Sequence, residues 1–356
     1  MGLQIIKSDT HIDFVGIRKF AFMISLALIL LGVGSLIMHG GPRYGIDFAG
    51  GINVQVKFDK EIEIDHLKTI LRDGGLADTT VQTFGLPQDN EFIIRVSALN
   101  VTTDEVRTKV ETTLNADMGN SGYKIQRQEM VGPKVGADLR EKALEAMFYA
   151  VLLIAIYISG RFEARWIVAG IMAAALAGGI YLLELVNLPM SLLIVAAMFI
   201  TIGLCWYLKL NYALGAVVAL IHDVIITVGV FSLLGKEFDL TIVAALLTII
   251  GYSLNDTIIV FDRIRENLRN GLGDTFADTI NRSINQTLSR TLLTSGTTLL
   301  VVAALYVLGG GVIHDFAFAL LIGVVIGTYS SIFVASPILM GIGPSAQPVE
   351  EEGAAA

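Results

Sequence analysis

Long runs of apolar residues constrain this chain more than any other feature of its sequence. The first run, from Phe20 to Met38, has the roughly 19 residues that an α-helix needs to cross the hydrocarbon core of a bilayer. Counting this run, eight spans are predicted, at about 20–38, 142–159, 166–184, 190–208, 212–234, 240–261, 290–309 and 316–340. The 356 residues are 54% hydrophobic and only 16% charged, which excludes a soluble globular protein.

The loops between the runs predict how the spans are oriented. Basic residues follow the second, fourth and sixth spans, namely Arg161, Arg165, Lys209, Arg263, Arg265, Arg269 and Arg282. The alternate short loops carry only Lys236. Because basic loops stay on the cytoplasmic side, both termini are predicted to be cytoplasmic and the segment 40–141 to lie outside. The first run is a full span with no A-x-A-like cleavage site after it, which indicates an uncleaved anchor.

The outer segment has the alternating pattern of a small α/β domain. Strands are predicted at 51–58, 78–85, 91–97 and 123–131, and helices at 63–75 and 102–115. This β-α-β-β-α-β order is that of the ferredoxin-like fold. No His/Cys cluster, nucleophile elbow or phosphate loop occurs in it, so binding or mechanical work is expected there. Four segments are thus predicted. Residues 1–39 contain the cytoplasmic N-terminus and the first span, 40–141 form the outer domain, 142–340 form the transmembrane bundle, and 341–356 are a disordered cytoplasmic tail.

Asp256 is the most unusual residue of the sixth span. It lies with Asn255 in YSLNDTIIVFDRIREN (252–267), inside the apolar part of the run. A charge at the bilayer centre costs about 2.5–3.5 kcal/mol on insertion scales, so such residues usually face a protein interior and are functional. Tyr252 is one helical turn away and shares the face of Asp256. The simpler interpretation is a carboxylate that reaches water at the membrane boundary, although an Asp side chain is short for this.

Two more polar features interrupt the spans. His222 and Asp223 lie near the middle of the fifth span, and they are either a hydrogen-bonded pair that fixes helix packing or functional residues. At the start of the seventh span, Arg290 accompanies a stripe of hydroxyls, Thr287, Thr291 and Thr294, which suits a hydrated crevice better than lipid. The simpler interpretation of Arg290 is a basic anchor at the helix mouth.

Together these residues suggest proton coupling. The predicted proton pathway consists of Asp256, Arg290, Asn255, Asp223 and His222, and the predicted supporting polar stripe of Tyr252, Thr287, Thr291 and Thr294. Desolvation of a carboxylate favours its protonated form, and a nearby cation favours the ionised form. Arg290 is always charged and can act as a fixed counter-charge. If the distance between Asp256 and Arg290 changes with conformation, Asp256 would bind a proton in one state and release it in another.

Several long motifs resemble the SecF family of bacterial protein-export membrane subunits. They are GIDFAGG (45–51), RFEARW (161–166), ALIHDVIITVGVF (219–231), EFDLTIVAALLTIIGYSLNDTIIVFDRIRENLR (237–269), INQTLSRTLLTSGTTLLVV (284–302) and GVVIGTYSSIFVASPIL (323–339). The resemblance covers nearly the whole chain apart from one segment and the tail. This sequence departs from the family in one respect. Members of the family normally run directly from the R-F-E segment to the helix that begins here at about residue 211. The extra segment, about 167–210, is predicted to be a two-helix insertion.

The resemblance implies a fold, partners and site residues. The fold is an RND-type (resistance-nodulation-division) half bundle with a ferredoxin-like outer domain, in the bacterial inner membrane. The partners are SecD, the SecYEG channel, the translocating polypeptide, protons and membrane lipid. The function is proton-motive-force-coupled help with late steps of protein export. Proton passage is assigned to Asp256 and Arg290. The motif containing Gly45, Asp47, Phe48, Gly50 and Gly51 is expected to shape the junction between the first span and the outer domain.

Three other functions are alternatives to this one. An RND-type small-molecule/proton antiporter is disfavoured because such proteins usually duplicate their spans and outer domains in one chain. An assembly scaffold without a proton step remains an alternative. An aspartyl protease dyad of Asp223 and Asp256 lacks the YD and GxGD contexts, so no enzyme activity is predicted. The single Cys205 excludes an internal disulfide or a cysteine metal site, and no metal or cofactor is expected. A net charge of −8 gives no reason to expect nucleic acid as a partner.

Overall fold

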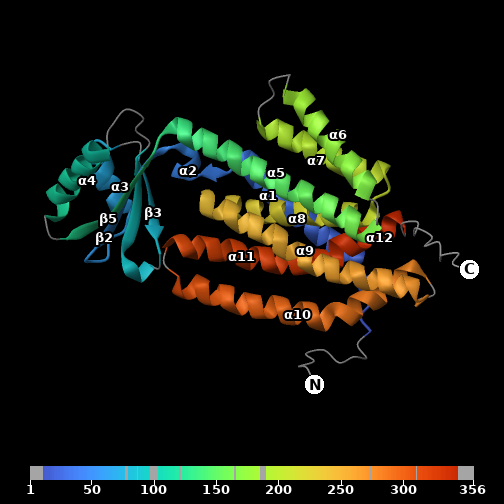
Figure 1. Ribbon diagram of the computed structural model, residues 1–356. Helices are drawn as coiled ribbons and strands as arrows, with labels where there is room; N and C mark the ends of the chain where they lie inside the picture. Colours follow the sequence, from blue (N-terminus) through green and yellow to red (C-terminus); the bar gives the residue numbers. More distant parts are fainter. Residues whose placement is uncertain are drawn as a thin grey trace, which may run out of the picture.

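The computed structural model describes residues 11–76, 79–85, 87–96, 103–119, 122–163, 166–184, 190–272, 275–309 and 311–343. A four-stranded sheet and two helices lie at one end of a long helical bundle (Figure 1). Of the predicted tail, only the first residues are described, where the last helix continues to Ile342. Residues 344–356 lie outside the described residues.

The outer domain has the predicted ferredoxin-like order. Its elements are β2 (Gly51–Phe58), α3 (Ile64–Asp73), β3 (Thr79–Phe84), β4 (Glu91–Val96), α4 (Thr103–Met118) and β5 (Tyr123–Val131). The sheet order is β3-β4-β2-β5, and every pair is antiparallel. The alternating apolar residues of β2 and β4 pack with α3 and α4 into one core, in which Ile52, Val54 and Ile94 are fully buried. The period-2 pattern therefore places one face of the sheet under the helices.

Six helical stretches in the described part of the chain are long and apolar enough to cross a membrane. They comprise α1 (Arg18–Met38), α5 (Pro133–Glu163), α8 (Asn211–Leu233), α9 (Leu240–Arg269), α10 (Phe276–Leu308) and the run α11 (Gly311–Ser330), η2 (Ser331–Ala335) and α12 (Ser336–Ile342). These six correspond to the predicted spans outside 166–208, while the two predicted spans at 166–184 and 190–208 fall on shorter apolar helices among the described residues. Within the described residues, helices α8 and α9 are mostly buried by their neighbours, whereas α10 is largely exposed.

The predicted insertion forms the helices α6 (Trp166–Glu184) and α7 (Met190–Tyr207). The apolar helical stretches described within them, Trp166–Ala175 and Val195–Tyr207, are shorter than the six span-length helices. The two helices pack on each other and on α5. They project from the side of the bundle at the end away from the sheet (Figure 1).

Several helices run further than the apolar runs predicted. Helix α9 continues through the charged residues to Arg269, and α10 begins at Phe276 behind a capping box of Thr275 and Asp278. At 1.5 Å per residue, the 33 residues of α10 extend about 50 Å, more than the thickness of a bilayer. Charged residues end an apolar run, but the backbone hydrogen bonds of a helix continue through them.

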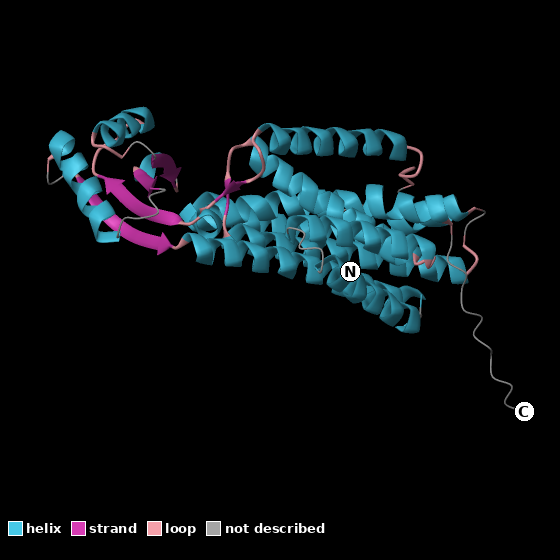
Figure 2. Cartoon of the chain, turned by 90° about the horizontal axis from the view of Figure 1, so that it is seen from above, coloured by secondary structure: helices cyan, strands magenta, loops and turns pink. Residues whose placement is uncertain are grey.

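Short elements join the outer domain to the bundle. The strand β1 (Arg43–Tyr44) pairs in parallel with β6 (Glu237–Phe238), and α2 (Ile46–Ala49) follows β1 directly. Figure 2 shows the strands of the main sheet at one end of the bundle, beyond this junction. The outer domain is therefore fastened to the beginning of α9, because β6 immediately precedes that helix.

Candidate functional site

Asp256 lies in the interior of the bundle, with 1% of its surface exposed. It is 16 residues from the start of α9, about 24 Å along the helix axis. Ser295 of α10 donates a 3.1 Å hydrogen bond to Oδ2 of Asp256, and Thr328 of α11 donates to Ser295 at 2.7 Å. A carboxyl group is thus held at mid-span by hydroxyls from two other helices, away from lipid.

Arg290 has a different environment. Its side chain lies on the exposed face of α10, and it forms no ion pair with Asp256 in the described structure. The sequence led us to expect a hydroxyl stripe facing a crevice. Of these residues, Thr287 and Thr291 are buried, and the hydroxyls of Thr287 and Thr294 donate to carbonyls of their own helix.

Asn255 and Tyr252, the predicted partners of Asp256 on α9, differ from it in their exposure. Asn255 is exposed, although it adjoins Asp256 in the sequence, because successive helical residues point about 100° apart. Tyr252 is half-buried, and its buried hydroxyl has no hydrogen-bond partner among the described residues. An unpartnered hydroxyl at this depth is unusual, since buried polar groups are generally hydrogen-bonded.

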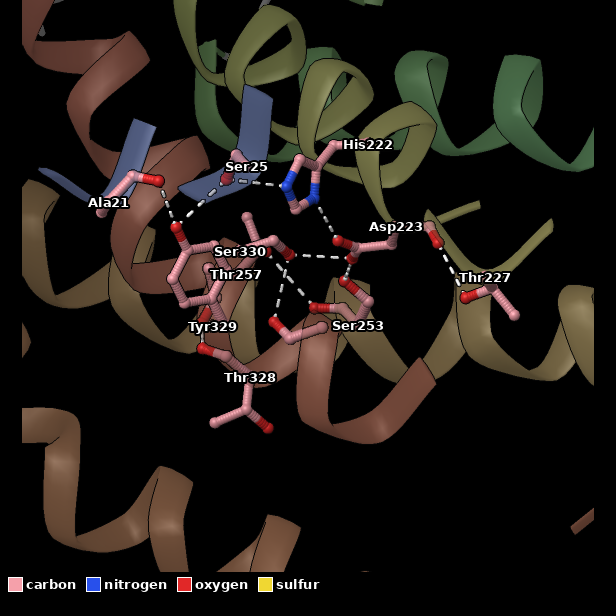
Figure 3. Close-up of polar contacts among 12 residues, drawn as sticks. Ala21, Ser25, His222, Asp223, Thr227, Ser253, Thr257, Thr328, Tyr329 and Ser330 are labelled. Atoms are coloured by element: carbon pink, nitrogen blue, oxygen red, sulfur yellow. Dashed lines mark hydrogen bonds and ion pairs between the residues drawn. The ribbon is translucent and has the colours of Figure 1, made fainter. Parts of the chain in front are cut away.

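A second carboxyl site surrounds Asp223 on α8, and Figure 3 shows it in full. Oδ1 of Asp223 lies 2.8 Å from Nδ1 of His222, and Oδ2 accepts hydrogen bonds from Ser253 at 2.5 Å and Ser330 at 2.8 Å. Asp223 and His222 are 1% and 5% exposed. The pair predicted from the fifth span therefore joins α8 to α9 and α11 in the centre of the bundle.

The imidazole of His222 continues this network toward α1. Its Nε2 lies 3.0 Å from the hydroxyl of Ser25, which lies 3.1 Å from the hydroxyl of Tyr329. Tyr329 donates a 2.6 Å hydrogen bond to the carbonyl oxygen of Ala21 (Figure 3). The rings of His222 and Tyr329 are stacked, with centroids 6.1 Å apart.

Close helix packing makes the second site possible. A Cβ atom on Gly327 would lie 2.9 Å from Cβ of Ser253, so α9 and α11 approach as closely as glycine permits. Directly after Ser330 the chain takes one π-helical segment, Ser331–Ala335. Such segments shift the register of a helix and are frequent at functional sites. Here Ser330, Ser331 and Ser336 are all buried.

The two carboxyl groups remain separate. Asp223 is bonded to His222, Ser253 and Ser330, whereas Asp256 is bonded to Ser295. A protease dyad needs two carboxyl groups that share one proton. No hydrogen bond joins these two, so the geometry does not favour that chemistry.

The glycine motif forms the junction at the outer end of α9. Oδ2 of Asp47 accepts a 3.0 Å hydrogen bond from the backbone N–H of Leu240, the first residue of α9. Gly45 donates its N–H to the carbonyl of Phe238, and Phe48 packs with Ala143 of α5 and Val243 of α9. Gly50 and Gly51 have positive φ angles of 75° and 129°. The motif thus contacts the same helix that carries Asp256.

Sequence analysis did not identify most of the hydroxyls in these networks. Ser25 stands alone in an apolar run, Ser295 lies among threonines, and Thr328, Tyr329 and Ser330 are consecutive. A break in the apolar pattern was the only available signal. An ion pair between Arg95 of β4 and Glu237 of β6 was also missed. Among the described residues, no group of three or more His, Cys, Asp or Glu side chains has an arrangement that could hold a metal ion.

Comparisons with known proteins agree on one family. A model for the C-terminal region of the protein export membrane proteins SecD/SecF matches residues 110–204 and 178–344. A model for the SecD/SecF GG motif matches residues 36–62. The two segments of the first match overlap inside the α6–α7 insertion.

Several curated relatives resemble the chain over nearly their whole length, and each is named protein translocase subunit SecF. The one from Magnetococcus marinus is 44% identical and covers 97% of this chain and 96% of its own. The one from Vibrio alginolyticus is 40% identical, with 99% and 98% covered, and that from Escherichia coli O157:H7 is 37% identical, with 96% and 93% covered.

Two solved structures have the same fold. The crystal structure of SecDF from Thermus thermophilus, a translocon-associated membrane protein, has a TM-score of 0.69 and 30% identity, covering 95% of this chain. SecDF in its super-membrane-facing form has a TM-score of 0.57 and 29% identity, covering 96% of this chain. This chain corresponds to 39% of each SecDF chain.

Proposed function

The chain belongs to the SecF family of protein translocase subunits, and on that premise we propose that it couples the proton gradient to late steps of protein export. The proposed proton-binding group is Asp256. The observation that carries this proposal is its burial at mid-span with a hydroxyl partner and without a salt bridge. A carboxyl group in such a place can exist with or without its proton, as an exchange site requires.

Arg290 is the proposed modulator of Asp256. Its side chain lies on the exposed face of α10, and a guanidinium is always charged, so its approach would favour the ionised form of the carboxyl group. Asn255 lies on the exposed face of α9, which packs against α10. Polar side chains on a surface at membrane depth favour coverage by another protein. We assign that cover to SecD, because the SecDF structures continue well beyond the part that this chain matches.

We further propose that the outer domain faces away from the cytoplasm, with the SecYEG channel and the translocating polypeptide as partners. The bacterial inner membrane is the proposed location, with both termini cytoplasmic. In support, Arg161, Arg265 and Arg269 line a cavity of about 510 Å³ at the end of α9 remote from the sheet. Basic residues at that end suit a cytoplasmic surface.

Secretion of a reporter protein into energised inverted vesicles tests the proton role. Asp256→Asn and Arg290→Met are compared with Asp262→Asn, which removes a half-exposed carboxylate from the same helix. We expect the first two variants to lose stimulation by the proton gradient and Asp262→Asn to keep it, with all three still bound to SecD. Full stimulation in both Asp256→Asn and Arg290→Met would favour a scaffold without a proton step. Proton-driven release of a small molecule without secretion would favour an antiporter.

A further inference from the structure

The number of hydrogen atoms in the network around His222 fixes the direction of its hydrogen bonds. Three contacts follow one another from the imidazole: Nε2 of His222 to Ser25, Ser25 to Tyr329, and Tyr329 to the carbonyl of Ala21. Their lengths are 3.0, 3.1 and 2.6 Å. A carbonyl oxygen only accepts, so the hydrogen of the Tyr329 hydroxyl is used in the last contact.

The direction of the remaining contacts is then fixed. Because Tyr329 has given its single hydrogen to Ala21, its oxygen must accept from Ser25, and Ser25 has given its single hydrogen in turn. The contact between Ser25 and His222 therefore has a hydrogen only if Nε2 carries one. On the other side of the ring, Asp223 already accepts from Ser253 and Ser330, which favours a carboxylate that also accepts from Nδ1–H.

We propose that His222 and Asp223 are a second proton-binding site, in which His222 is an imidazolium paired with the Asp223 carboxylate. The extra proton leaves through the hydroxyls of Ser25 and Tyr329. The proton of Tyr329 passes to a water molecule, that of Ser25 to Tyr329, and that of Nε2 to Ser25. One proton is released, and Ser25 and Tyr329 each keep one hydrogen. The Ser25 hydroxyl then donates to Nε2 of His222, the Tyr329 hydroxyl donates to Ser25, and the carbonyl of Ala21 no longer accepts a hydrogen bond from Tyr329.

The burial of the network suits this relay. His222, Asp223 and Ser25 are buried, whereas Tyr329 is half-buried and so connects the pair to the edge of the bundle. Ion pairing keeps the buried charges compatible with the interior, because an imidazolium beside a carboxylate is neutral overall.

In the described structure no Lys or Arg forms a hydrogen bond or ion pair with His222 or Asp223. The elements that pack on α8 at membrane depth contribute the titratable side chains Asp256 and Tyr252 from α9, Tyr329 from α11, Tyr149 and Tyr157 from α5, and Cys205 and Tyr207 from α7. Only Tyr329 belongs to the relay, and Ser253 links Asp223 to the helix of Asp256.

This inference deepens the proposed function, since it adds a second site to a proton-coupled chain. The two sites share α9: Ser253, which bonds to Asp223, lies three residues before Asp256. A change at one carboxyl group therefore alters the contacts of the helix that carries the other.

Nitrogen-15 NMR of histidine in the full-length chain tests the protonation directly. The protein has five histidines, and the His222 signals are those lost in His222→Asn. At pH 7 we expect both ring nitrogens of His222 to be protonated. In Tyr329→Phe, the Ser25 hydroxyl is free to donate to Nε2, so one ring proton should be lost. Tyr306→Phe, outside the network, should keep both.

Two results would overturn the proposal that His222 is an imidazolium. A wild-type spectrum with only one protonated ring nitrogen overturns the proposal without any variant of the relay. So does a doubly protonated ring that is unchanged in Tyr329→Phe. If that variant does not fold, Ser25→Ala replaces it, with loss of one ring proton expected and Ser25→Thr as the control that keeps the hydroxyl. The spectrum does not depend on export, so failure of the Asp256 assay leaves this result independent.

Discussion

Ser253 donates a 2.5 Å hydrogen bond to Asp223, and this contact joins α9 to α8 in the centre of the bundle. Gly327 lets the serine approach, because any side chain there would meet Cβ of Ser253 at 2.9 Å. Helix α9 therefore contacts both buried carboxyl groups: it bonds to Asp223 through Ser253, and it carries Asp256 itself.

Removal of this hydroxyl should weaken the bundle. Ser253→Ala leaves the buried Asp223 with two partners in place of three, and loss of such a bond costs about 1–3 kcal/mol. Thr248→Ala is the control, since its exposed hydroxyl bonds only to Ala244 in the same helix. Unfolding of the two variants in detergent measures the difference, and equal unfolding midpoints would contradict the expectation.

The ion pair of Arg95 and Glu237 should hold the outer domain to the bundle. Nη1 of Arg95 donates to Oε1 of Glu237 at 2.6 Å, Nη2 bonds to Oε2, and Gln82 adds a 2.8 Å hydrogen bond to Oε1. With side chains 12% and 19% exposed, removal of one partner should cost about 1–3 kcal/mol, less than for a fully buried pair.

A double-mutant cycle of Arg95→Gln and Glu237→Gln measures this coupling, and hydrogen exchange should increase in both 43–58 and 234–242. Glu145→Gln is the matched control, because its partner Lys142 is largely exposed and such a pair contributes little. Additive effects of the two substitutions would show that the pair does not act as a clamp.

Gly50 should tolerate no side chain. Its φ of 75° and ψ of 168° lie in a region that is essentially restricted to glycine, and a Cβ atom would lie 2.9 Å from Cα of Pro133. Gly50→Ala should destabilise the junction by about 1–3 kcal/mol. Gly132→Ala nearby, where a Cβ atom meets nothing within 4 Å, should be close to neutral in the same unfolding experiment. Equal losses would mean that backbone strain at Gly50 is not the cause.

Asp239 should make stability depend on pH. Burial raises the pKa of this carboxyl group above its ordinary value of 3.8, the N–H of Ile242 opposes the effect, and the negative charge of Asp47 adds to it. The folded protein thus keeps the proton of Asp239 at a pH where the unfolded chain has lost it. Its contribution to stability is fully present below pH 3.8 and is lost as the pH rises through the folded pKa.

The variant Asp239→Asn retains a good helix cap without the charge. Its unfolding midpoint, measured against wild type from pH 4 to pH 7, should rise relative to wild type as the pH increases. A constant difference over that range would contradict the prediction.

Much of the architecture could be predicted from the sequence. Alternating apolar residues in GINVQVKF (51–58) and EFIIRV (91–96) fixed two strands and their buried face, because a strand has a period of two. Apolar runs located the spans, since only a helix satisfies its own backbone in lipid. They did not show that α9 and α10 extend beyond the membrane, because charged residues end an apolar run without ending a helix.

By itself the sequence determined which residues are unfavourable in lipid: Asp223, Asp256 and Arg290 stand out because their charge conflicts with their surroundings. The tertiary structure alone decided where each one goes. It enclosed Asp223 among Ser253, Ser330 and His222, held Asp256 against Ser295, and left Arg290 on the exposed face of α10. Helical periodicity gives the face of a residue on its own helix. The partner across that face depends on how neighbouring helices rotate and how closely they approach, as Gly327 shows for α9 and α11.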